Sequence, residues 1–327
     1  MQGGVNMNNV LVVDKLQTAF NTEKGEVVSV DEVSFQLASG ETIAIVGESG
    51  CGKSVTSLSI MKLLGSKGFI KSGLIELEGV DLTNLPEIYM KEVRGRLISM
   101  IFQDPMTSLN PVYTIGNQLS EPLIKHLKYS KREAWKEAEG LLKKVGIPRA
   151  EDIMKSYPHA LSGGMKQRVM IAMALSCNPK VLIADEPTTA LDVTIQAQIL
   201  NLLKELKEQF NTSIIFITHD LGVVADIADR VIVMYAGQVV EETDVFTLFE
   251  NPQHPYTKGL IDSIPHLELD GAEKLNTIEG SVPSLTEMLP GCRYHNRCPY
   301  AMEACKVKQP KLIEVAEGHR VRCLLAN

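Results

Sequence analysis

Residues 47–54 read GESGCGKS, and this short stretch decides the fold class. It follows the apolar run ETIAIVG (41–47), which has the composition of a buried strand, and it leads into KSVTSLSIMKLL (53–64), which has helical spacing. The stretch matches the pattern G-x-x-x-x-G-K-[ST], in which a glycine-rich turn joins a strand to a helix. This order predicts an α/β protein with an anion site at the turn.

The residue types in this turn suit a nucleotide phosphate. Glycines allow backbone N–H groups to point inward and form a concave nest for anions, and the turn has them at Gly47, Gly50 and Gly52. Lys53 supplies a mobile positive charge for the β- and γ-phosphates, and the Ser54 hydroxyl can bind Mg²⁺. A glycine turn with an incidental lysine is the alternative, but it does not account for the flanking strand and helix. The stretch therefore predicts a nucleotide site.

A second stretch, VLIADE (181–186), has the pattern of a buried strand that ends in two carboxylates. Open α/β sheets bind ligands at the carboxyl ends of their strands, and Asp185 is placed there to hold the Mg²⁺ shell. Glu186 can accept a proton from the water that attacks the γ-phosphate. In isolation the two acids could equally be a solvated strand end, but beside the phosphate turn they indicate hydrolysis.

Composition excludes several classes of protein. The chain has 327 residues, of which 44% are hydrophobic and 22% charged, so it is neither low-complexity nor disordered. Its formal charge of −7 gives no reason to expect a nucleic-acid partner. No apolar run approaches the roughly 18 residues of a membrane span, and the start MQGGVNMNN lacks the features of an export signal. The six cysteines are then expected to be free or metal-bound.

The order of patterns along the chain predicts its organisation. Alternating residues at 10–48 and 71–80 predict strands, and amphipathic spacing from about 86 to 175 predicts helices. Short apolar runs at 181–185, 213–218 and 231–237 predict buried parallel strands, with a helix between the first two.

Four further motifs give the chain a specific resemblance. They are LSGGMKQR (161–168), Gln103 in IFQDP, TALD (189–192) and His219 in ITHD. With the phosphate turn and VLIADE, they make the sequence resemble the ATPase subunits of ABC transporters over essentially its whole length. In that family they are similar to the signature, the Q-loop glutamine, the D-loop and the switch histidine.

The resemblance implies a P-loop NTPase fold of the ABC type. It consists of a RecA-like α/β core, a β-rich N-terminal subdomain, an inserted helical subdomain at about 104–175 and a small Cys-rich C-terminal domain. We expect the ATPase domain to span residues 1–250 and a C-terminal extension to span residues 251–327.

The resemblance also implies which residues bind Mg·ATP and which act on it. The expected catalytic residues are Glu186, His219 and Gln103, and His219 would contact the γ-phosphate. The expected Mg²⁺ ligands are Ser54, Gln103 and Asp185. The expected ATP contacts are Gly47, Ser49, Gly50, Cys51, Gly52, Lys53, Ser54 and Val55, with Ser162, Gly163 and Gly164 of the signature meeting the ATP held by the opposite subunit.

Two further expectations concern single side chains. This family stacks adenine on an aromatic ring upstream of the phosphate loop, and Phe20, in the loop-like stretch TAFNTEKGE, is preferred over Phe35, which alternates into a strand core. Cys51, near a helix N-terminus, is expected to have a lowered pKa and a reactive thiol. Alkylation would then slow ATP hydrolysis, and bound ATP would protect the thiol.

After Phe249 the sequence becomes Pro-rich and irregular, and its motifs narrow the resemblance. The stretches NPQHPYTKGLIDSIP (251–265), IEGSVPSL (278–285) and GCRYHNRCPYAMEAC (291–305) resemble the C-terminal extension of oligopeptide and dipeptide importer ATPases. QDPMTSLNP (103–111) points to the same branch. The first half is most similar to the D-type subunit, which pairs with a homologous F-type subunit.

Four cysteines gather at the end of the chain: Cys292, Cys298, Cys305 and Cys323. Their spacing is unspecific, since four thiolates can bind zinc or a [4Fe–4S] cluster, and thiols can also stay free. In the peptide-importer branch the pattern resembles a [4Fe–4S] ligand set, so that cluster is the expectation and zinc the alternative.

The combined expectation is an ATP-hydrolysing subunit of a di-/oligopeptide ABC importer, peripheral on the cytoplasmic side of the cell membrane. The implied partners are a homologous second ATPase subunit in a heterodimer that sandwiches two ATP molecules, two transmembrane permease subunits and an extracytoplasmic substrate-binding protein. Two alternatives stay open: an importer of nickel or another small solute, and a soluble ABC-type ATPase of DNA repair or translation. Two cassettes in one chain or long coiled-coil insertions are usual in the latter, and the sequence has neither.

Overall fold

The structure is a computed structural model that describes residues 9–23, 25–104, 108–189, 192–264, 277–285, 288 and 290–326. The chain groups into two compact units. Unit 1 comprises Met1–Val10, Leu37–Glu41 and Asn84–Phe216, and unit 2 comprises Leu11–Gln36, Thr42–Thr83 and Ile217–Asn327. Each unit is therefore built from segments that lie far apart in the sequence.

One sheet of unit 2 is built from four strands in the order β2-β1-β4-β5. They are β1 (Asn9–Thr22), β2 (Gly25–Ala38), β4 (Gly68–Leu77) and β5 (Val80–Asp81). Alternate side chains of a strand share one face, and Val33 and Phe35 of β2 are at most 2% exposed. The strands expected at 10–48 and 71–80 are confirmed, and Phe35 is a core residue.

A second set of strands in unit 2 precedes and follows the phosphate loop. β3 (Thr42–Val46) pairs in parallel with β9 (Arg230–Tyr235), and the sheet continues through β10 (Gln238–Asp244), β12 (His319–Val321) and β11 (Ile313–Ala316). All five residues of β3 are buried, as is typical of a parallel strand that is covered on both faces. The N–H of Thr42 donates a 2.7 Å hydrogen bond to Asp229, which fixes where β3 begins beside β9.

Most helices of unit 2 begin after a residue that caps them. α9 (Leu221–Ile227), α10 (Val245–Glu250) and α11 (Pro255–Asp262) follow Asp220, Asp244 and His254, whose side chains accept hydrogen bonds from N–H groups of the first turn. α1 (Lys53–Ile60) instead follows Gly52, which offers no side-chain cap, and α12 (Glu303–Val307) lies near the end of the chain. The N-terminus of α1 therefore has no side-chain cap from its N-cap residue.

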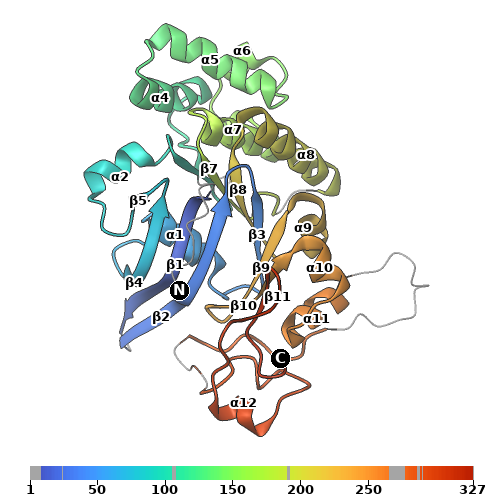
Figure 1. The fold of residues 1–327 in the computed structure, drawn as a ribbon. Coiled ribbons are helices and arrows are strands. Elements are labelled where there is room, and N and C mark those ends of the chain that lie inside the picture. Colours follow the sequence, from blue (N-terminus) through green and yellow to red (C-terminus); the bar gives the residue numbers. More distant parts are fainter. Residues whose placement is uncertain are drawn as a thin grey trace, which may run out of the picture. The chain divides into compact units, whose positions relative to one another are not determined.

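Unit 1 holds the parallel strands β6 (Ile98–Ile101) and β7 (Val181–Asp185), and the chain passes from unit 1 to unit 2 within β8 (Ser213–Thr218). Its helices are α2 (Glu87–Val93), α4 (Ile115–Leu127), α5 (Lys131–Lys144), α6 (Ala150–Ile153), the 3-10 helix η1 (Pro158–Ala160), α7 (Gly163–Leu175) and α8 (Val193–Phe210). α5 packs on α4 and on α6, all three green in Figure 1, and α4 and α5 also contact α7. In the described ranges, no helix is both long enough and apolar enough to cross a membrane.

Helix α5 shows how local sequence fixes an element of this unit. The Ser130 side chain accepts a hydrogen bond from the N–H of Glu133, whose carboxylate accepts one from the N–H of Ser130, so the helix begins with a capping box. Ala134, Ala138 and Leu141 follow at helical spacing and are buried. α5 confirms one of the helices expected between about 86 and 175.

The C-terminal segment, meaning the described residues from 277 onward, does not form a domain of its own. Tyr294 packs against Tyr235 of β9 and Tyr256 of α11, with ring centroids 5.1 and 5.4 Å apart. The same buried cluster contains Val46 of β3. The expected small Cys-rich C-terminal domain is not supported, because this segment shares the core of the unit that holds the phosphate loop.

Candidate functional site

The phosphate loop lies between β3 and α1, as the sequence predicts. Gly47, Gly50 and Gly52 have φ angles of 147°, 79° and 104°, in the region that residues with side chains rarely adopt. A Cβ atom on Gly47 would lie 2.2 Å from the carbonyl oxygen of Met234. The glycines therefore allow a path that ends at the N-terminus of α1, and the N–H groups at a helix N-terminus attract anions.

The Lys53 ammonium group is held inside this loop. The side chain is 5% exposed, and Nζ donates hydrogen bonds to the carbonyl oxygens of Gly47 (2.7 Å) and Glu48 (3.1 Å). Carbonyl groups orient the cation without cancelling its charge, so the ammonium group can attract a phosphate oxygen.

Cys51 overturns one expectation. Its side chain is fully buried, and this burial raises the pKa of the thiol, although Lys53 opposes the shift. A buried neutral thiol is a poor nucleophile. The expected lowered pKa and reactive thiol are therefore wrong, because desolvation outweighs the nearby lysine.

At the end of β7, two acidic residues stand in different surroundings. Asp185 is the last residue of the strand and is 5% exposed, whereas Glu186 has a φ of 47° that turns the chain away from the strand. The side-chain amide of Gln103 donates a 2.9 Å hydrogen bond to Glu186 Oε2, and the Thr189 hydroxyl donates one of 2.9 Å to the same oxygen. The structure thus brings together Gln103 and Glu186, two residues that were assigned separately.

The signature residues form the start of α7. Ser162 is the N-cap and accepts a hydrogen bond from the N–H of Met165, while Gly163 and Gly164 begin the first turn. Such a helix start can bind an anionic group. Gln167 donates a 2.5 Å hydrogen bond to the carbonyl oxygen of Pro187, so α7 is tied to the residue that follows Glu186.

His219 directly follows β8 and is exposed. The expected site residues fall into two groups by unit: residues 47–55 and His219 in unit 2, and Gln103, Asp185, Glu186 and the signature residues in unit 1. Residues 190 and 191 of the D-loop TALD, and residues 105–107 of QDPMTSLNP, lie outside the described residues.

Phe20 lies in a strand rather than in the expected loop. It belongs to β1 and pairs with Gly68 of β4, where a Cβ atom would lie 2.7 Å from the phenyl ring. The pairing with β4 makes Phe20 a strand residue although polar residues follow it. The side chain is half-buried, so part of the ring remains accessible for stacking.

The four cysteines near the C-terminus influence one another. Burial raises the pKa of Cys292 to about 11, and Cys305, Cys323 and Cys298 add to the shift. The N–H of Cys292 donates a 2.8 Å hydrogen bond to the carbonyl oxygen of Cys305. Yet among the residues that the structure describes, no group of three or more His, Cys, Asp or Glu side chains is arranged to hold a metal ion. The described geometry therefore does not support the expected [4Fe–4S] or zinc site.

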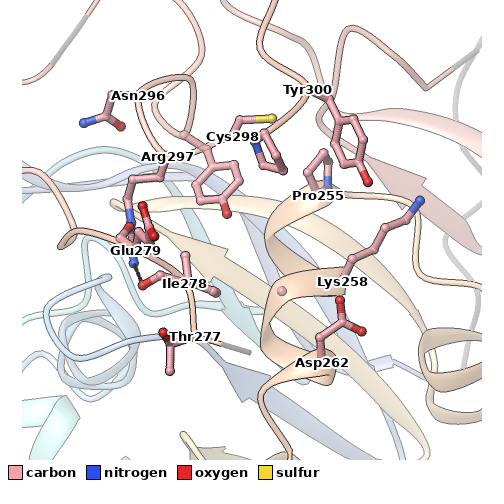
Figure 2. A pocket seen from close by; sticks show the side chains of 13 residues that line it. Pro255, Lys258, Asp262, Thr277, Ile278, Glu279, Asn296, Arg297, Cys298 and Tyr300 are labelled. Carbon is pink, nitrogen blue, oxygen red and sulfur yellow. Dashed lines mark hydrogen bonds between the residues drawn. The ribbon is translucent and has the colours of Figure 1, made fainter. Parts of the chain in front are cut away.

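A cavity of about 490 Å³ lies beside this segment. Figure 2 shows side chains that line it, among them Lys258 and Asp262 of α11 and Arg297, Cys298 and Tyr300 of the C-terminal segment. Because α11 and the C-terminal segment line it, this cavity is not the nucleotide site.

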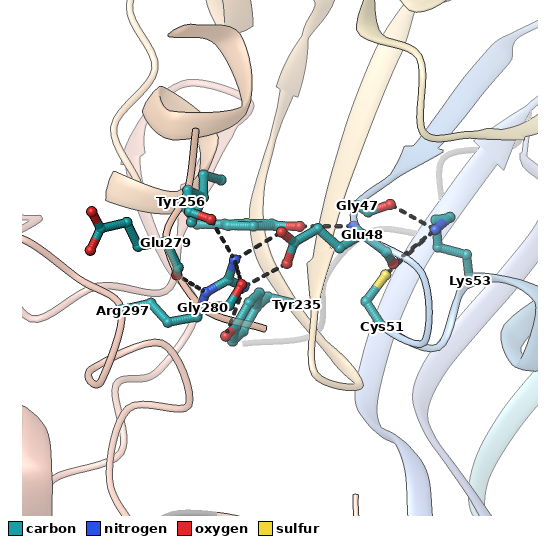
Figure 3. A network of polar contacts seen from close by, with 10 residues as sticks. Gly47, Glu48, Cys51, Lys53, Tyr235, Tyr256, Glu279, Gly280 and Arg297 are labelled. Carbon is teal, nitrogen blue, oxygen red and sulfur yellow. Dashed lines mark hydrogen bonds and ion pairs between the residues drawn. The ribbon is translucent and has the colours of Figure 1, made fainter. Parts of the chain in front are cut away.

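Sequence reasoning missed two side chains that contact Glu48 of the phosphate loop. Arg297 forms an ion pair with its carboxylate, and the Tyr256 hydroxyl accepts a hydrogen bond from its N–H (Figure 3). They lie 249 and 208 positions from Glu48, and no motif gives either of them a role at the loop. Only the fold brings them there.

Two families match this chain. Residues 30–189 match the family described as ABC transporter, and residues 240–305 match the oligopeptide/dipeptide transporter, C-terminal region. Among solved structures, one similar chain is the dimeric post-hydrolysis state of the ATP-binding cassette MJ0796 bound to ADP and Pi, with a TM-score of 0.64, 28% identity and coverage of 72% of this chain and 98% of that one. Another is cbiO1 from Clostridium perfringens, part of the ABC transporter complex cbiONQ, with a TM-score of 0.63, 29% identity and coverage of 75% and 92%.

Curated relatives are similar over nearly the whole length. The oligopeptide transport ATP-binding protein AppD of Bacillus subtilis is 58% identical over 321 residues, which cover 98% of this chain and 97% of the relative. The dipeptide transport ATP-binding protein DppD of the same organism is 53% identical over 322 residues, which cover 98% and 96%. The chain therefore belongs to the ABC transporter family of ATPases, in the branch that carries the oligopeptide/dipeptide transporter C-terminal region.

Proposed function

We propose that this ABC ATPase powers the import of di- and oligopeptides. The observation that carries the proposal is the Lys53 ammonium group, held by loop carbonyls beside the N-terminus of α1. The similarity to an oligopeptide and a dipeptide transport ATP-binding protein over nearly the full chain supports peptides as the cargo.

In this proposal the phosphate loop binds the ATP phosphates. Backbone N–H groups of residues 49–55 and the Lys53 ammonium group contact the phosphate oxygens. The oxygen-bearing side chains of Ser54, Gln103 and Asp185 suit Mg²⁺, which would neutralise phosphate charge. The accessible part of the Phe20 ring stacks on adenine.

Hydrolysis uses the carboxylate at the end of β7. Glu186 accepts a proton from the attacking water, and its orientation is set by the donors Gln103 and Thr189 on Oε2. His219 contacts the γ-phosphate and positions the water and Glu186. In this proposal Gln103, Glu186 and His219, which come after buried strands, each have one role in hydrolysis.

The signature of one subunit acts on the ATP of another. The N–H groups and hydroxyl of Ser162, Gly163 and Gly164 meet an ATP bound to a homologous second ATPase subunit, in a heterodimer that sandwiches two ATP molecules. The similarity to a dimeric cassette structure supports a dimer.

The remaining assignments concern the assembly. The ATPase domain spans residues 1–250, with a helical subdomain at about 104–175 that docks on two transmembrane permease subunits, and the extension spans 251–327. The chain is then peripheral on the cytoplasmic side of the membrane. An extracytoplasmic substrate-binding protein delivers the peptide.

Membrane pull-down and transport test this function together. A tagged chain should co-purify with two permeases and a second ATPase, and the assembly should take up labelled di- or oligopeptides when ATP is supplied. Uptake of Ni²⁺ without peptides, or co-purification with ribosomes or DNA in place of permeases, would contradict the proposal.

No step of this cycle passes through the cysteines near the C-terminus. The resemblance alone implies a [4Fe–4S] cluster, or zinc, at Cys292, Cys298, Cys305 and Cys323. Iron and zinc analysis of anaerobically purified protein checks that implication separately from the ATPase assignment.

A further inference from the structure

We infer that Arg297 and Tyr256 are positioning residues for the phosphate loop, which they hold through Glu48. Glu48 in turn holds the ammonium group of Lys53, so the C-terminal segment sets the affinity of the subunit for Mg·ATP. The inference rests on the proposed role of Lys53 as the cation that binds phosphate.

The Arg297 guanidinium binds the Glu48 carboxylate through two parallel hydrogen bonds. Nη1 lies 2.6 Å from Oε2, and Nη2 lies 2.9 Å from Oε1. A fork of two charge-assisted bonds fixes both the position and the direction of a carboxylate. The Arg297 side chain is 3% exposed, so this pair is better shielded from water than an ordinary surface pair.

The guanidinium is itself fixed by the backbone of the C-terminal segment. Nε donates a 2.8 Å hydrogen bond to the carbonyl oxygen of Glu279, and Nη2 makes longer bonds of 3.3 Å to those of Ile278 and Gly280. The Tyr235 ring lies 5.8 Å from the guanidinium carbon. With these contacts made, Arg297 cannot follow Glu48 if the loop moves, and it acts as an anchor.

Tyr256 fixes a second group of Glu48. Its hydroxyl accepts a 2.8 Å hydrogen bond from the Glu48 N–H. The Tyr256 side chain is fully buried, and its ring packs edge-on against Tyr235 with centroids 4.7 Å apart. Because the ring is packed, the hydroxyl stays in place and defines the direction of the Glu48 N–H.

The third group of Glu48 reaches the lysine. Its carbonyl oxygen accepts the 3.1 Å hydrogen bond from Lys53, beside the 2.7 Å bond to Gly47 (Figure 3). A residue fixed at its N–H, its carboxylate and its carbonyl gives the ammonium group a defined position. If Glu48 turns, the ammonium group loses one of these two carbonyl partners.

Arg297 also acts through charge. Glu48 places a carboxylate in a loop that must attract an anion, and the guanidinium compensates that negative charge. Without the guanidinium, the carboxylate would repel the phosphates of ATP. When Arg297 is replaced, removing the charge of Glu48 as well should then restore part of the lost affinity for Mg·ATP. A purely structural role of Arg297 does not predict this recovery.

The test compares Arg297→Gln, Tyr256→Phe, Glu48→Gln and the double variant Glu48→Gln/Arg297→Gln in the full-length chain. Arg320→Gln is the matched control, because Arg320 is another arginine of the C-terminal segment that pairs with a buried carboxylate, Glu242 of β10. For each variant, the KM for Mg·ATP and kcat are measured beside the midpoint of thermal unfolding.

We expect Arg297→Gln to raise the KM for Mg·ATP about tenfold, the size expected when a charge-assisted pair is lost. Tyr256→Phe should raise it by a smaller factor, and the double variant should have a lower KM than Arg297→Gln alone. Arg320→Gln should change the unfolding midpoint and leave the KM unaltered. A KM in Arg297→Gln no higher than in Arg320→Gln, or a double variant as impaired as Arg297→Gln, would overturn the inference.

Lys53→Ala separates this inference from the proposed role of the lysine. If Lys53→Ala hydrolyses ATP like the unaltered chain, the role of Lys53 is wrong and the inference fails with it. If Lys53→Ala is inactive while Arg297→Gln has an unaltered KM, only the inference fails.

Discussion

The side-chain amide of Gln103 lies 2.9 Å from Oε2 of Glu186 and donates a hydrogen bond to it. Gln103 follows β6 and Glu186 follows β7, and these two strands are parallel neighbours. Their adjacent carboxyl ends explain how two residues far apart in the sequence meet. A change at Glu186 therefore affects both the proposed base and the acceptor of the Gln103 hydrogen bond.

Glu186→Gln should lower kcat for ATP hydrolysis by about 10²–10⁴-fold, the usual contribution of a general base. The amide has nearly the same shape, so Mg·ATP should still bind and should stay unhydrolysed on the protein. The measurement is the ATP-to-ADP ratio of nucleotide that co-elutes in gel filtration. Hydrolysis at the unaltered rate would show that Glu186 is not the base.

Gly47→Ala should destabilise the fold more than Gly50→Ala does. Both glycines have positive φ, which costs a residue with a side chain about 1–2 kcal/mol. At Gly47 the added Cβ would also lie 2.2 Å from the Met234 carbonyl oxygen, whereas at Gly50 nothing lies within 4 Å. Urea unfolding of the two variants checks the difference, and equal losses would mean that the loop can shift away from β9.

Alkylation of the native protein should leave Cys51 unmodified, because its thiol is buried and its pKa is raised. Mass spectrometry of the peptide that contains Cys51, after iodoacetamide treatment without denaturant, measures this directly. Cys51→Ser serves as the control for activity losses that arise at other cysteines. The contradicting result is rapid labelling of Cys51 that is prevented by bound ATP. It would show that the thiol is reactive, as the sequence suggests.

The free energy of unfolding should decrease as the pH is lowered, and His254 is the cause. Burial lowers the pKa of His254 to about 3, from 6.5 in the unfolded chain. As the pH falls below 6.5, His254 becomes protonated in the unfolded chain but stays neutral in the folded chain. The free energy of unfolding therefore decreases. This contribution is complete above pH 6.5 and is lost toward pH 3, by up to about 1.4 kcal/mol per pH unit.

His254→Asn isolates this effect. Asparagine can still accept the hydrogen bond that the Tyr256 N–H donates to His254 Nδ1, and it does not titrate. The free energy of unfolding of this variant should fall less steeply between pH 6.5 and about pH 4.5. Parallel curves for the variant and the unaltered chain would assign the pH dependence to other groups.

The parts of the fold that sequence patterns predict are those with local causes. The strands at 42–46, 181–185 and 213–218 are continuous apolar runs, and α5 has a capping box and a periodic apolar face. Phe20 was expected in a loop because polar residues follow it, whereas its pairing with Gly68 of β4, which is not local, keeps it in β1.

Sequence patterns also did not predict the contacts that support the phosphate loop, because these contacts join residues far apart in the sequence. Arg297 and Tyr256 reach Glu48 only because the C-terminal segment packs in the core that contains β3 and β9. Cys51 is the opposite case. Its neighbours in the motif suggest a lowered pKa of the thiol, but its burial raises that pKa. Burial depends on the whole fold, so a short motif does not reveal it.

Uptake of a labelled oligopeptide by vesicles that hold the assembled transporter tests the central claim most directly. The account predicts ATP-dependent uptake with the unaltered chain and none with Glu186→Gln, although that variant still binds Mg·ATP. Peptide uptake at the unaltered rate with Glu186→Gln would contradict it.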